Sequence, residues 1–394
     1  MHSKIIRVGV FGNDYAVIRM IRNKAPNVQY FELQNKLSLN RLFFRILGKM
    51  FPKYKYSDVY SQHVTFVLNP KKEDVDVIHL FNRVNLNDKY RWVSTFEKTF
   101  PEYSSSESNL DKVNLRKLIE IVSKDNCLKI LALSKWALNY EKWLLDTCSN
   151  SIVASKIINK TQVLYPPQKL YINEEEVKQK FNNLKKVTVI FVGRQMKRKG
   201  GLNLLRAAVS LHDKIDFSLI YIGSKQQGYN NYFLSEGEIR EFDNIINSCA
   251  WIKYYSELDN EKVIKLLLKS HVGVLPTLGD TFGFSVLEMQ ACGCPVITTN
   301  REAMCEINNE KIGWMIDTKK LKISQGDDYG NYTQEEIEMI SREIDKQLPI
   351  ILEQAISHKS ELMVKAIGCI QKIRSVHSPE KYAEQLTEIY QTKE

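Results

Sequence analysis

The stretch that decides the fold reads Asp280-Thr-Phe-Gly-Phe-Ser-Val-Leu-Glu288 and continues Met-Gln-Ala-Cys-Gly-Cys-Pro-Val-Ile-Thr298. A short apolar run rich in β-formers, residues 272–276, comes before it. Residues 284–291 have a helix-forming composition that stops at Gly293 and Pro295. The stretch therefore predicts a strand that leads through a loop into a helix N-terminus, where backbone N–H groups carry partial positive charge.

The side chains around this loop suit a ligand that has an anionic centre and hydroxyl groups at both ends. Because Gly283 has no Cβ, the amides of residues 282–285 can come close to a phosphate. Asp280 can accept hydrogen bonds from sugar hydroxyls, and Glu288, further into the helix, can accept two from a ribose diol. The residues assigned to the ligand here are Asp280, Phe282, Gly283, Phe284, Ser285 and Glu288.

A second block supplies positive charge. The apolar strand candidate 187–192 runs into Gly193-Arg194-Gln-Met-Lys-Arg-Lys199-Gly200, after which an amphipathic helix begins. A basic turn taken alone is more often a solvated surface loop. Between a strand and a helix, however, it can clamp a phosphate and supply the charge that a leaving nucleoside diphosphate needs. Both blocks in this order, with a strand candidate between them, predict a donor site that also includes Gly193, Arg194, Lys199 and Gly223.

Together the two blocks resemble the retaining glycosyltransferases of the GT-B fold, the large family 4 group. In that family a Glu is followed eight residues later by a second Glu, and the first of them corresponds to Asp280 here, which keeps the charge on a shorter side chain. The family's Gly-Arg and Lys-Gly pairs match Arg194 and Lys199, which would hold the diphosphate. The resemblance, clearest over residues 186–316, implies two Rossmann-like, doubly wound α/β domains facing across a cleft, and transfer of a hexose-type sugar with retention.

Composition is consistent with such a protein. A chain of 394 residues exceeds the usual size of a single hydrophobic core, and an apolar fraction of 43% is typical of a globular protein. No run of about eighteen apolar residues occurs, and residues 1–7 carry charge where a signal peptide has its apolar region. The seven scattered cysteines do not form a disulfide framework. We therefore expect a cytoplasmic protein with reduced thiols.

Strand-like and helix-like segments alternate along the whole chain, which predicts a doubly wound sheet in each half. Pro166 and Pro167 end the last strand of the first half, and the acidic stretch 174–176 begins the second, so the domain boundary is placed near residue 168. The expected strands cover residues 4–11, 75–81, 92–96 and 130–133 in the first half, and 187–192, 217–222, 252–254, 272–275, 296–298 and 313–316 in the second.

The first domain, residues 1–168, is expected to bind the acceptor, and the second, residues 169–377, the nucleotide-sugar donor. In GT-B proteins the last helix crosses back onto the first domain, and residues from about 378 to 394 are the candidate for that helix. Ser134 is a plausible N-cap for a helix of the first domain, and a long helix is expected over residues 334–357.

Two residues of the first domain bear on the reaction. In family 4 the turn after the first strand approaches the donor phosphates, and Gly12 occupies it here. Glu97 stands where many members place a His near the junction of sugar and acceptor. A carboxylate at the C-terminal end of a strand can accept a hydroxyl proton, although a Glu paired on the surface with Lys98 or Arg91 explains the same residue.

No metal or other cofactor is expected in catalysis. Asp74 and Asp76 have the spacing of an acid pair but lie beside lysines at the start of a strand, and Cys292 and Cys294 lack a second pair or a nearby His. We interpret the two cysteines as small buried residues at a helix end. His79, inside an apolar run, is interpreted as a core histidine and not as a ligand.

The basic excess is confined to the first half. Residues 1–170 hold 27 Lys and Arg against 15 Asp and Glu, while the rest of the chain is slightly acidic. Within residues 41–56 basic side chains alternate with large apolar and aromatic ones, a composition that attracts anionic headgroups. A core-facing helix with a solvated basic side would look the same, and no nucleic-acid-binding motif accompanies the stretch. The residues assigned to a membrane surface are Arg41, Phe44, Arg45, Lys49, Phe51 and Lys53.

The sequence thus predicts a hexosyltransferase associated peripherally with the inner membrane. The expected partners are a nucleotide-diphosphate sugar, a saccharide or lipid-linked saccharide acceptor of bacterial surface-polysaccharide assembly such as O-antigen or capsule, and the anionic inner leaflet, but no nucleic acid. Two alternatives remain open. A GT-B sugar-nucleotide epimerase would convert the donor without an acceptor, and a non-catalytic GT-B partner subunit would keep the fold while losing the clamp residues.

Overall fold

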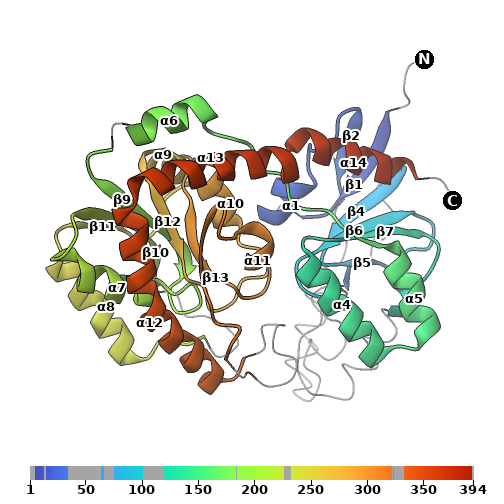
Figure 1. Cartoon of the computed structure of the whole chain (residues 1–394). Coiled ribbons are helices and arrows are strands. Elements are labelled where there is room, and N and C mark those ends of the chain that lie inside the picture. Colours follow the sequence, from blue (N-terminus) through green and yellow to red (C-terminus); the bar gives the residue numbers. More distant parts are fainter. Residues whose placement is uncertain are drawn as a thin grey trace, which may run out of the picture. The chain divides into compact units, whose positions relative to one another are not determined.

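The computed structural model describes residues 5–12, 15–33, 64–65, 75–100, 119–182, 184–225, 232–321, 323 and 332–392. The chain forms two units, one made of residues 1–167 and 379–394 and the other of residues 168–378. Each unit is an α/β structure built around its own parallel sheet (Figure 1).

The sheet of the first unit has the strand order β2-β1-β4-β6-β7-β8, and all its strands run parallel. Its central strands are buried on both faces, so most of their residues are apolar. Strand β2 was not predicted, because it lies at the sheet edge and is only half-buried. The strands are β1 (Ile6–Val10), β2 (Val28–Glu32), β4 (Val77–Phe81), β6 (Trp92–Phe96), β7 (Cys127–Ala132) and β8 (Thr161–Val163), with a separate short pair, β3 (Val64–Thr65) and β5 (Val84–Asn85).

The sheet of the second unit has the strand order β11-β10-β9-β12-β13-β14, again parallel throughout. In the middle, Val189 of β9 lies between Leu219 of β10 and Val272 of β12, and all three side chains are fully buried. The six strands predicted in this half are confirmed. They are β9 (Val187–Gln195), β10 (Phe217–Ser224), β11 (Ile252–Tyr255), β12 (Val272–Leu275), β13 (Val296–Thr299) and β14 (Gly313–Ile316).

Helices cover both faces of this second sheet. In Figure 1, α7, α8 and α12 group on one side of it, and α9, α10 and α13 on the other. The long helix predicted over 334–357 is confirmed as α12. The helices of this unit are α6 (Glu174–Asn182), α7 (Gly201–His212), α8 (Glu236–Ser248), α9 (Asn260–Lys269), α10 (Phe284–Ala291), α11 (Met304–Ile307), α12 (Gln334–Ser357) and α13 (Lys359–Val376).

Several helices begin where a short polar side chain can cap them. In the first unit, which also holds α1 (Tyr15–Met20), α4 (Lys135–Cys148), α5 (Ser151–Lys160) and α14 (Pro379–Gln391), the predicted cap Ser134 accepts a hydrogen bond from the Ala137 N–H. In the second unit Ser235 and Thr333 form capping boxes at α8 and α12, and Asp259 caps α9. Each of these side chains satisfies an N–H group that the helix itself leaves unpaired.

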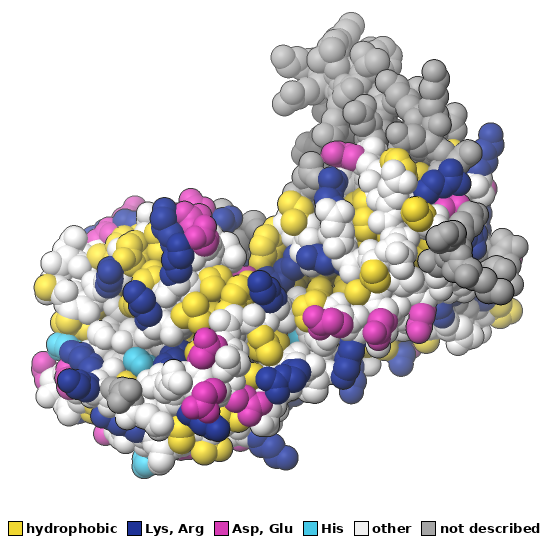
Figure 2. Space-filling view, turned by 90° about the horizontal axis from the view of Figure 1, so that it is seen from above, with side chains coloured by type: hydrophobic (Ala, Val, Ile, Leu, Met, Phe, Trp, Pro, Cys, Tyr) yellow, Lys and Arg dark blue, Asp and Glu magenta, His cyan; other side chains and the backbone are white. Residues whose placement is uncertain are grey.

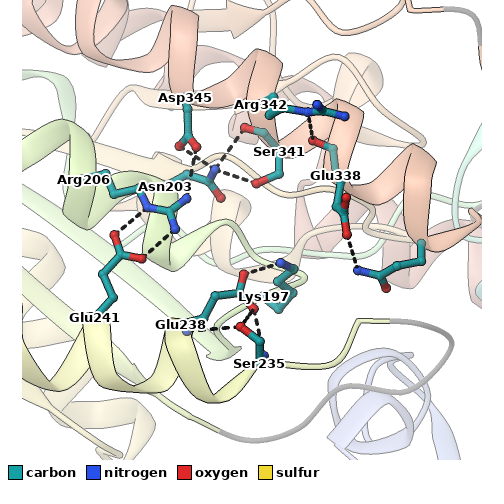
Figure 3. Close-up of polar contacts among 11 residues, drawn as sticks. Lys197, Asn203, Arg206, Ser235, Glu238, Glu241, Glu338, Ser341, Arg342 and Asp345 are labelled. Atoms are coloured by element: carbon teal, nitrogen blue, oxygen red, sulfur yellow. Dashed lines mark hydrogen bonds and ion pairs between the residues drawn. The ribbon is translucent and has the colours of Figure 1, made fainter.

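A polar network joins α7 to α8 and α12 (Figure 3). Arg206 of α7 donates two hydrogen bonds, both 2.7 Å, to the carboxylate of Glu241 on α8 and a third of 3.1 Å to Asp345 on α12. One turn earlier, Asn203 donates to Asp345 at 2.7 Å and to the hydroxyl of Ser341 at 2.9 Å. Paired and bidentate contacts restrict orientation more than a single ion pair does, so the network fixes how α7 lies on its sheet.

Residues weighed as metal ligands have structural roles here. Cys292 and Cys294 are buried at the end of α10, as predicted, and the Cys294 thiol donates to the carbonyl oxygens of Leu267 and Ser270. Asp76 pairs with Arg7, and Asp74 lies outside the described residues. Among the residues that the structure describes, no group of three or more His, Cys, Asp and Glu side chains could hold a metal ion. The same part of the chain contains no helix long and apolar enough to span a membrane.

The last helix, α14, packs on the sheet of the first unit through a buried polar contact. His79 of β4 is fully buried, with Nδ1 2.7 Å from the hydroxyl of Tyr390 and Nε2 2.8 Å from that of Thr95. The hydroxyl of Tyr382, also on α14, donates to the Met20 carbonyl at 2.8 Å. His79 is therefore a core histidine, as predicted, and burial lowers its pKa to about 3.

Replacing His79 with Gln should reduce the decrease in unfolding free energy that accompanies a fall in pH. An unfolded His binds its proton near pH 6.5, whereas the folded one resists it until about pH 3, so the stabilising contribution present above pH 6.5 is lost as the pH falls toward 3. Between pH 7 and pH 5 the wild type should lose about 2 kcal/mol more of its unfolding free energy than His79→Gln. Urea unfolding at the two pH values measures the difference.

The matched control is His358→Gln, because His358 is exposed at the end of α12. That variant should keep the pH dependence of the wild type. If His79→Gln keeps it too, the buried imidazole does not resist protonation in the folded protein.

Candidate functional site

The second sheet changes its winding direction between β9 and β12. From β9 the chain moves outward through β10 to β11 on one side, and from β12 through β13 to β14 on the other. In open α/β sheets, ligands bind beyond the carboxyl ends of the strands at such a switch point. The two segments that the sequence singled out, 193–200 and 276–285, follow these two strands.

Direct contacts tie the two segments together. The carbonyl oxygen of Arg198 accepts hydrogen bonds from the Leu278 N–H at 2.8 Å and from the Thr277 hydroxyl at 3.0 Å. Gly200 has φ +68, and a Cβ there would lie 2.1 Å from the carbonyl oxygen of Pro276. Only glycine permits both this backbone conformation and this approach. This close packing brings Lys199 and Asp280, which are 81 positions apart in the sequence, into one site.

Two helices begin at this site without a side-chain cap. Gly200 precedes α7 and Gly283, with φ +84, precedes α10, and neither helix has a side-chain hydrogen bond at its N-cap. Neighbouring α8 and α9 begin at other strand ends and do have capping side chains. First-turn N–H groups that no side chain satisfies are suited to binding an anion.

A charged group lies between these helix starts. Lys199 forms an ion pair with Asp280, and the Arg198 guanidinium lies 4.0 Å from the same carboxylate while donating to the Gly279 carbonyl at 3.0 Å. The Lys199 and Asp280 side chains are 13% and 9% exposed. Burial alone would raise the pKa of Asp280, but Lys199, Arg198 and the Phe282 backbone hold that pKa below its ordinary value. Asp280 is therefore ionised at neutral pH and neutralised by two cations.

The other two cations of the basic turn point elsewhere. Arg194 is 78% exposed and pairs with Glu257 at 3.0 Å, so the structure does not join it to Lys199 and Asp280. Lys197 pairs with Glu238 of the α8 capping box, as Figure 3 shows. Sequence analysis selected Arg194 and missed Arg198, since four cations in six residues give no sign of which will turn toward the acid. The sequence did not show that Lys197 pairs with Glu238 of the neighbouring helix α8.

The remaining donor-site residues of the second unit lie on or beside α10. Glu288 is buried on that helix and accepts a hydrogen bond of 3.4 Å from Asn260 at the start of α9. Phe282 is buried, and its ring contacts that of Phe284, while Ser285 lies in the first turn of the helix. Gly193 and Gly223 have a packing role, because a Cβ at Gly223 would lie 2.3 Å from the Gly193 carbonyl oxygen.

Gly12 and Glu97, assigned to the same reaction, lie in the first unit. Gly12 follows β1, and its carbonyl accepts a hydrogen bond of 3.2 Å from Arg22. Glu97 follows β6, and its N–H donates to the Asn82 side chain at 3.2 Å. Both stand at carboxyl ends of strands of the first sheet. Each is thus placed within its own unit where ligands of doubly wound sheets bind.

The stretch assigned to a membrane surface lies outside the described residues: Arg41, Phe44, Arg45, Lys49, Phe51 and Lys53 all fall between residues 34 and 63. Over the described part of the face drawn in Figure 2, basic and acidic side chains occur together.

The family comparison concerns this second unit. Residues 172–324 match the family model described as "Glycosyl transferases group 1", a range that includes β9 to β14 and every charged residue of the site above. The second unit carries a glycosyltransferase group 1 domain. A D-inositol 3-phosphate glycosyltransferase of Corynebacterium jeikeium is 25% identical over 131 residues, which are 32% of this chain and 30% of that protein.

Solved structures similar to the whole chain show its fold. The HepE protein of Anabaena, solved in complex with UDP, has 12% identity and a TM-score of 0.57, with 97% of this chain and 98% of that one covered. A Rickettsia africae glycosyltransferase has 13% identity and a TM-score of 0.58, with 99% and 98% covered. Sucrose-phosphate synthase from Thermosynechococcus elongatus has 13% identity and a TM-score of 0.57, with 98% of each chain covered. The chain has two Rossmann-like α/β domains, which match those of GT-B glycosyltransferase structures.

Replacing single cations of the turn should separate Arg198 from Arg194. Arg198→Ala and Lys199→Ala should each weaken pyrophosphate binding about 10- to 100-fold, because each removes a charged hydrogen-bond donor from the group between the uncapped helices. Arg194→Ala should weaken it less than about threefold, because that guanidinium is exposed and paired with Glu257. Isothermal titration calorimetry gives the affinities.

Lys197→Ala is the matched control, since Lys197 belongs to the same turn but points to Glu238. It should bind pyrophosphate as the wild type does. A large effect of Arg194→Ala combined with none of Arg198→Ala would support the assignment made from sequence.

Proposed function

We propose that this protein transfers a hexose-type sugar from a nucleoside diphosphate donor to a saccharide or lipid-linked saccharide acceptor, with retention at the anomeric carbon. The observation that carries the proposal is the group of Arg198, Lys199 and Asp280 between two uncapped helix N-termini, inside a region that matches glycosyltransferases. Cations beside helix N-termini that lack a side-chain cap suit a diphosphate, and a carboxylate beside them suits a sugar.

In this proposal the second unit stabilises the departing nucleoside diphosphate without a metal ion. When the bond between the anomeric carbon and the diphosphate breaks, negative charge develops on the phosphate oxygen. Lys199, Arg198 and the first-turn N–H groups of α7 and α10 are fixed in place by the contacts described above, so they stabilise that charge without reorganising. Arg194, the other cation that the sequence assigned to the clamp, is exposed and paired with Glu257, so it makes the smaller contribution to holding the diphosphate.

The two acids have different partners in this proposal. Glu288 is held on α10 beside Asn260 and accepts from the ribose hydroxyls. Asp280, at the other end of the loop, accepts from hydroxyls of the donor sugar once the diphosphate draws Lys199 and Arg198 toward itself. Glu97 and Gly12 of the first unit would act on the acceptor side and on the donor phosphates.

Two alternatives predict different products. A sugar-nucleotide epimerase would convert the donor with no acceptor present, and a non-catalytic partner subunit would bind nucleotide without turnover. The presence of Arg198, Lys199, Asp280 and Glu288 together favours a catalytic protein over the second of these. A thermal-shift screen of UDP, GDP, ADP and their hexoses, followed by NMR detection of products with and without saccharide acceptors, distinguishes the three.

Substitution of the two acids should have opposite effects on nucleotide binding. Glu288→Ala should weaken binding of the nucleoside diphosphate about tenfold or more, because it removes the proposed acceptor for the ribose. Asp280→Asn should leave that affinity unchanged or tighten it up to about tenfold, since an amide no longer competes with the phosphates for Lys199 and Arg198. It should also lower kcat at least about 100-fold. Equal losses of nucleotide affinity in both variants would contradict this division of roles.

A role in surface-polysaccharide assembly, with peripheral association at an anionic inner membrane, is the further part of the proposal, and it is supported by the composition of residues 41–56 alone. Changing Arg41, Arg45, Lys49 and Lys53 together to Gln should abolish sedimentation with anionic vesicles at physiological salt, because each basic residue near the surface contributes roughly 1 kcal/mol. Activity on a soluble acceptor analogue should persist. A wild type that ignores anionic vesicles at low salt would favour a soluble acceptor.

A further inference from the structure

One glutamate beside the site has a backbone conformation that its side chain does not favour. Within the described ranges the non-glycine residues with positive φ are Asn23, Asn27, Asn82 and Glu302. Asparagine adopts this region readily, but for glutamate, here with φ +48, it costs roughly 1 kcal/mol or more. Glu302 lies between β13 and α11, next along the sheet from β12. Strain of this kind persists where surrounding contacts hold it, and it is concentrated at ligand sites.

The carboxylate of Glu302 lies directly against the loop that carries Asp280. A Cβ added to Gly279 would be 2.7 Å from Glu302 Oε1 and 3.0 Å from the hydroxyl oxygen of Tyr232. Burial lowers the pKa of Lys199 from its ordinary value, and Asp280 and then Glu302 oppose that shift. The strained backbone therefore places a second carboxylate beside the loop of Asp280 and within electrostatic reach of Lys199.

The hydroxyl of Tyr232 makes no hydrogen bond within the part of the chain that the structure describes. The side chain is 4% exposed, and its oxygen has no hydrogen-bond partner among the described residues. Leaving a buried hydroxyl unpaired costs roughly 1–3 kcal/mol in a typical protein. Burial, and next the Glu302 carboxylate, raise the pKa of Tyr232, so the phenol keeps its proton and remains an O–H donor at neutral pH.

We propose that Glu302 is a second sugar-binding carboxylate of the donor site. It accepts a hydrogen bond from one hydroxyl group of the donor hexose, beside the hydroxyl group whose hydrogen bond Asp280 accepts, and the Tyr232 hydroxyl orients the Glu302 carboxylate. The inference rests on the proposed function and deepens it, because it names the residue that distinguishes one hexose from another. When the diphosphate takes up Lys199 and Arg198, Asp280 and Glu302 are left as adjacent acceptors. Adjacent carboxylates match neighbouring hydroxyls, whose geometry differs among epimers.

The charge and the strain of Glu302 can be removed separately. Glu302→Gln keeps the side-chain length and the positive φ but loses the carboxylate, whereas Glu302→Gly removes the side chain and adopts φ +48 without strain. Glu302→Gly should melt at or up to about 3 °C above the wild type. Both variants should bind the bare nucleoside diphosphate at least as tightly as the wild type, because they remove a carboxylate beside Lys199 and none of the groups proposed to hold the phosphates or the ribose.

The deciding readout is donor preference. For the wild type, kcat/KM is measured with the preferred nucleoside diphosphate hexose from the screen above, with its epimers and with its single deoxy forms. Both Glu302 variants should lose about 10- to 100-fold in kcat/KM on the preferred hexose and should use at least one deoxy or epimeric donor almost equally well. An unchanged ratio between donors would overturn the inference and leave Glu302 a packing residue.

Tyr232→Phe tests the orienting hydroxyl. Because that oxygen has no hydrogen-bond partner among the residues that the structure describes, its removal should leave the melting temperature unchanged or higher, while the preference between donors falls about 3- to 10-fold. The matched control is Tyr221→Phe, since Tyr221 is a core residue of β10 whose hydroxyl is also buried and without a partner among the described residues. It should keep the wild-type preference. Equal effects of the two substitutions would overturn the role of Tyr232.

Failure of the inference and failure of the proposed function give different results. If the wild type turns over no nucleoside diphosphate hexose, both fail. If the wild type is active and the Glu302 variants keep its donor preference, the transferase assignment stands and the inference alone is wrong.

Discussion

The pairing of β9 with β12 is the constraint on which the candidate site depends. These two strands are neighbours in the sheet although two strands and three helices separate them in the chain. Gly200 can then pack against the Pro276 carbonyl, and the Arg198 carbonyl can accept from Thr277 and Leu278. Without that pairing, the basic turn and the acid would be unconnected loops. The site therefore depends first on the order of the strands in the sheet, which brings the two loops together, and then on the individual residues of those loops.

Electrostatics within the site follows from burial. Lys199 and Asp280 are largely shielded from water, where an unpaired charge is costly, so each requires the other in the absence of a ligand. Arg194 and Glu257 are exposed and exchange their partner for water at little cost. In the proposed complex, a diphosphate at the starts of α7 and α10 would meet two cations, Arg198 and Lys199, that are already held in place. Preorganised charge of this kind is what stabilises a leaving group.

Two other features of the site lower the stability of the fold. They are the strained backbone of Glu302 and the Tyr232 hydroxyl, which has no hydrogen-bond partner among the described residues. They adjoin the same loop, whereas the other non-glycine residues with positive φ in the described ranges are asparagines of the first unit. Local features that disagree with the fold are expected where a ligand supplies the missing interaction. The hydrogen bonds of Arg206 to Glu241 and Asp345 hold α7, which begins at the site, against its neighbouring helices. A rigid surrounding structure of this kind allows such unfavourable local features to persist.

The sequence by itself determined the fold class, the strands of the second unit and the residues near the donor loop, because buried parallel strands appear as apolar runs and because glycine, acid and basic residues stand at short, fixed spacings beside them. It identified Ser134 as a cap and His79 as a core residue for the same local reasons. Tertiary structure alone decided which cations meet Asp280, since α8 takes Lys197 and the loop at Glu257 takes Arg194, leaving Arg198 and Lys199. It also decided that Glu302 and Tyr232 lie beside Gly279, because those three residues are brought together by sheet order and by a backbone conformation that no local sequence pattern of glutamate predicts.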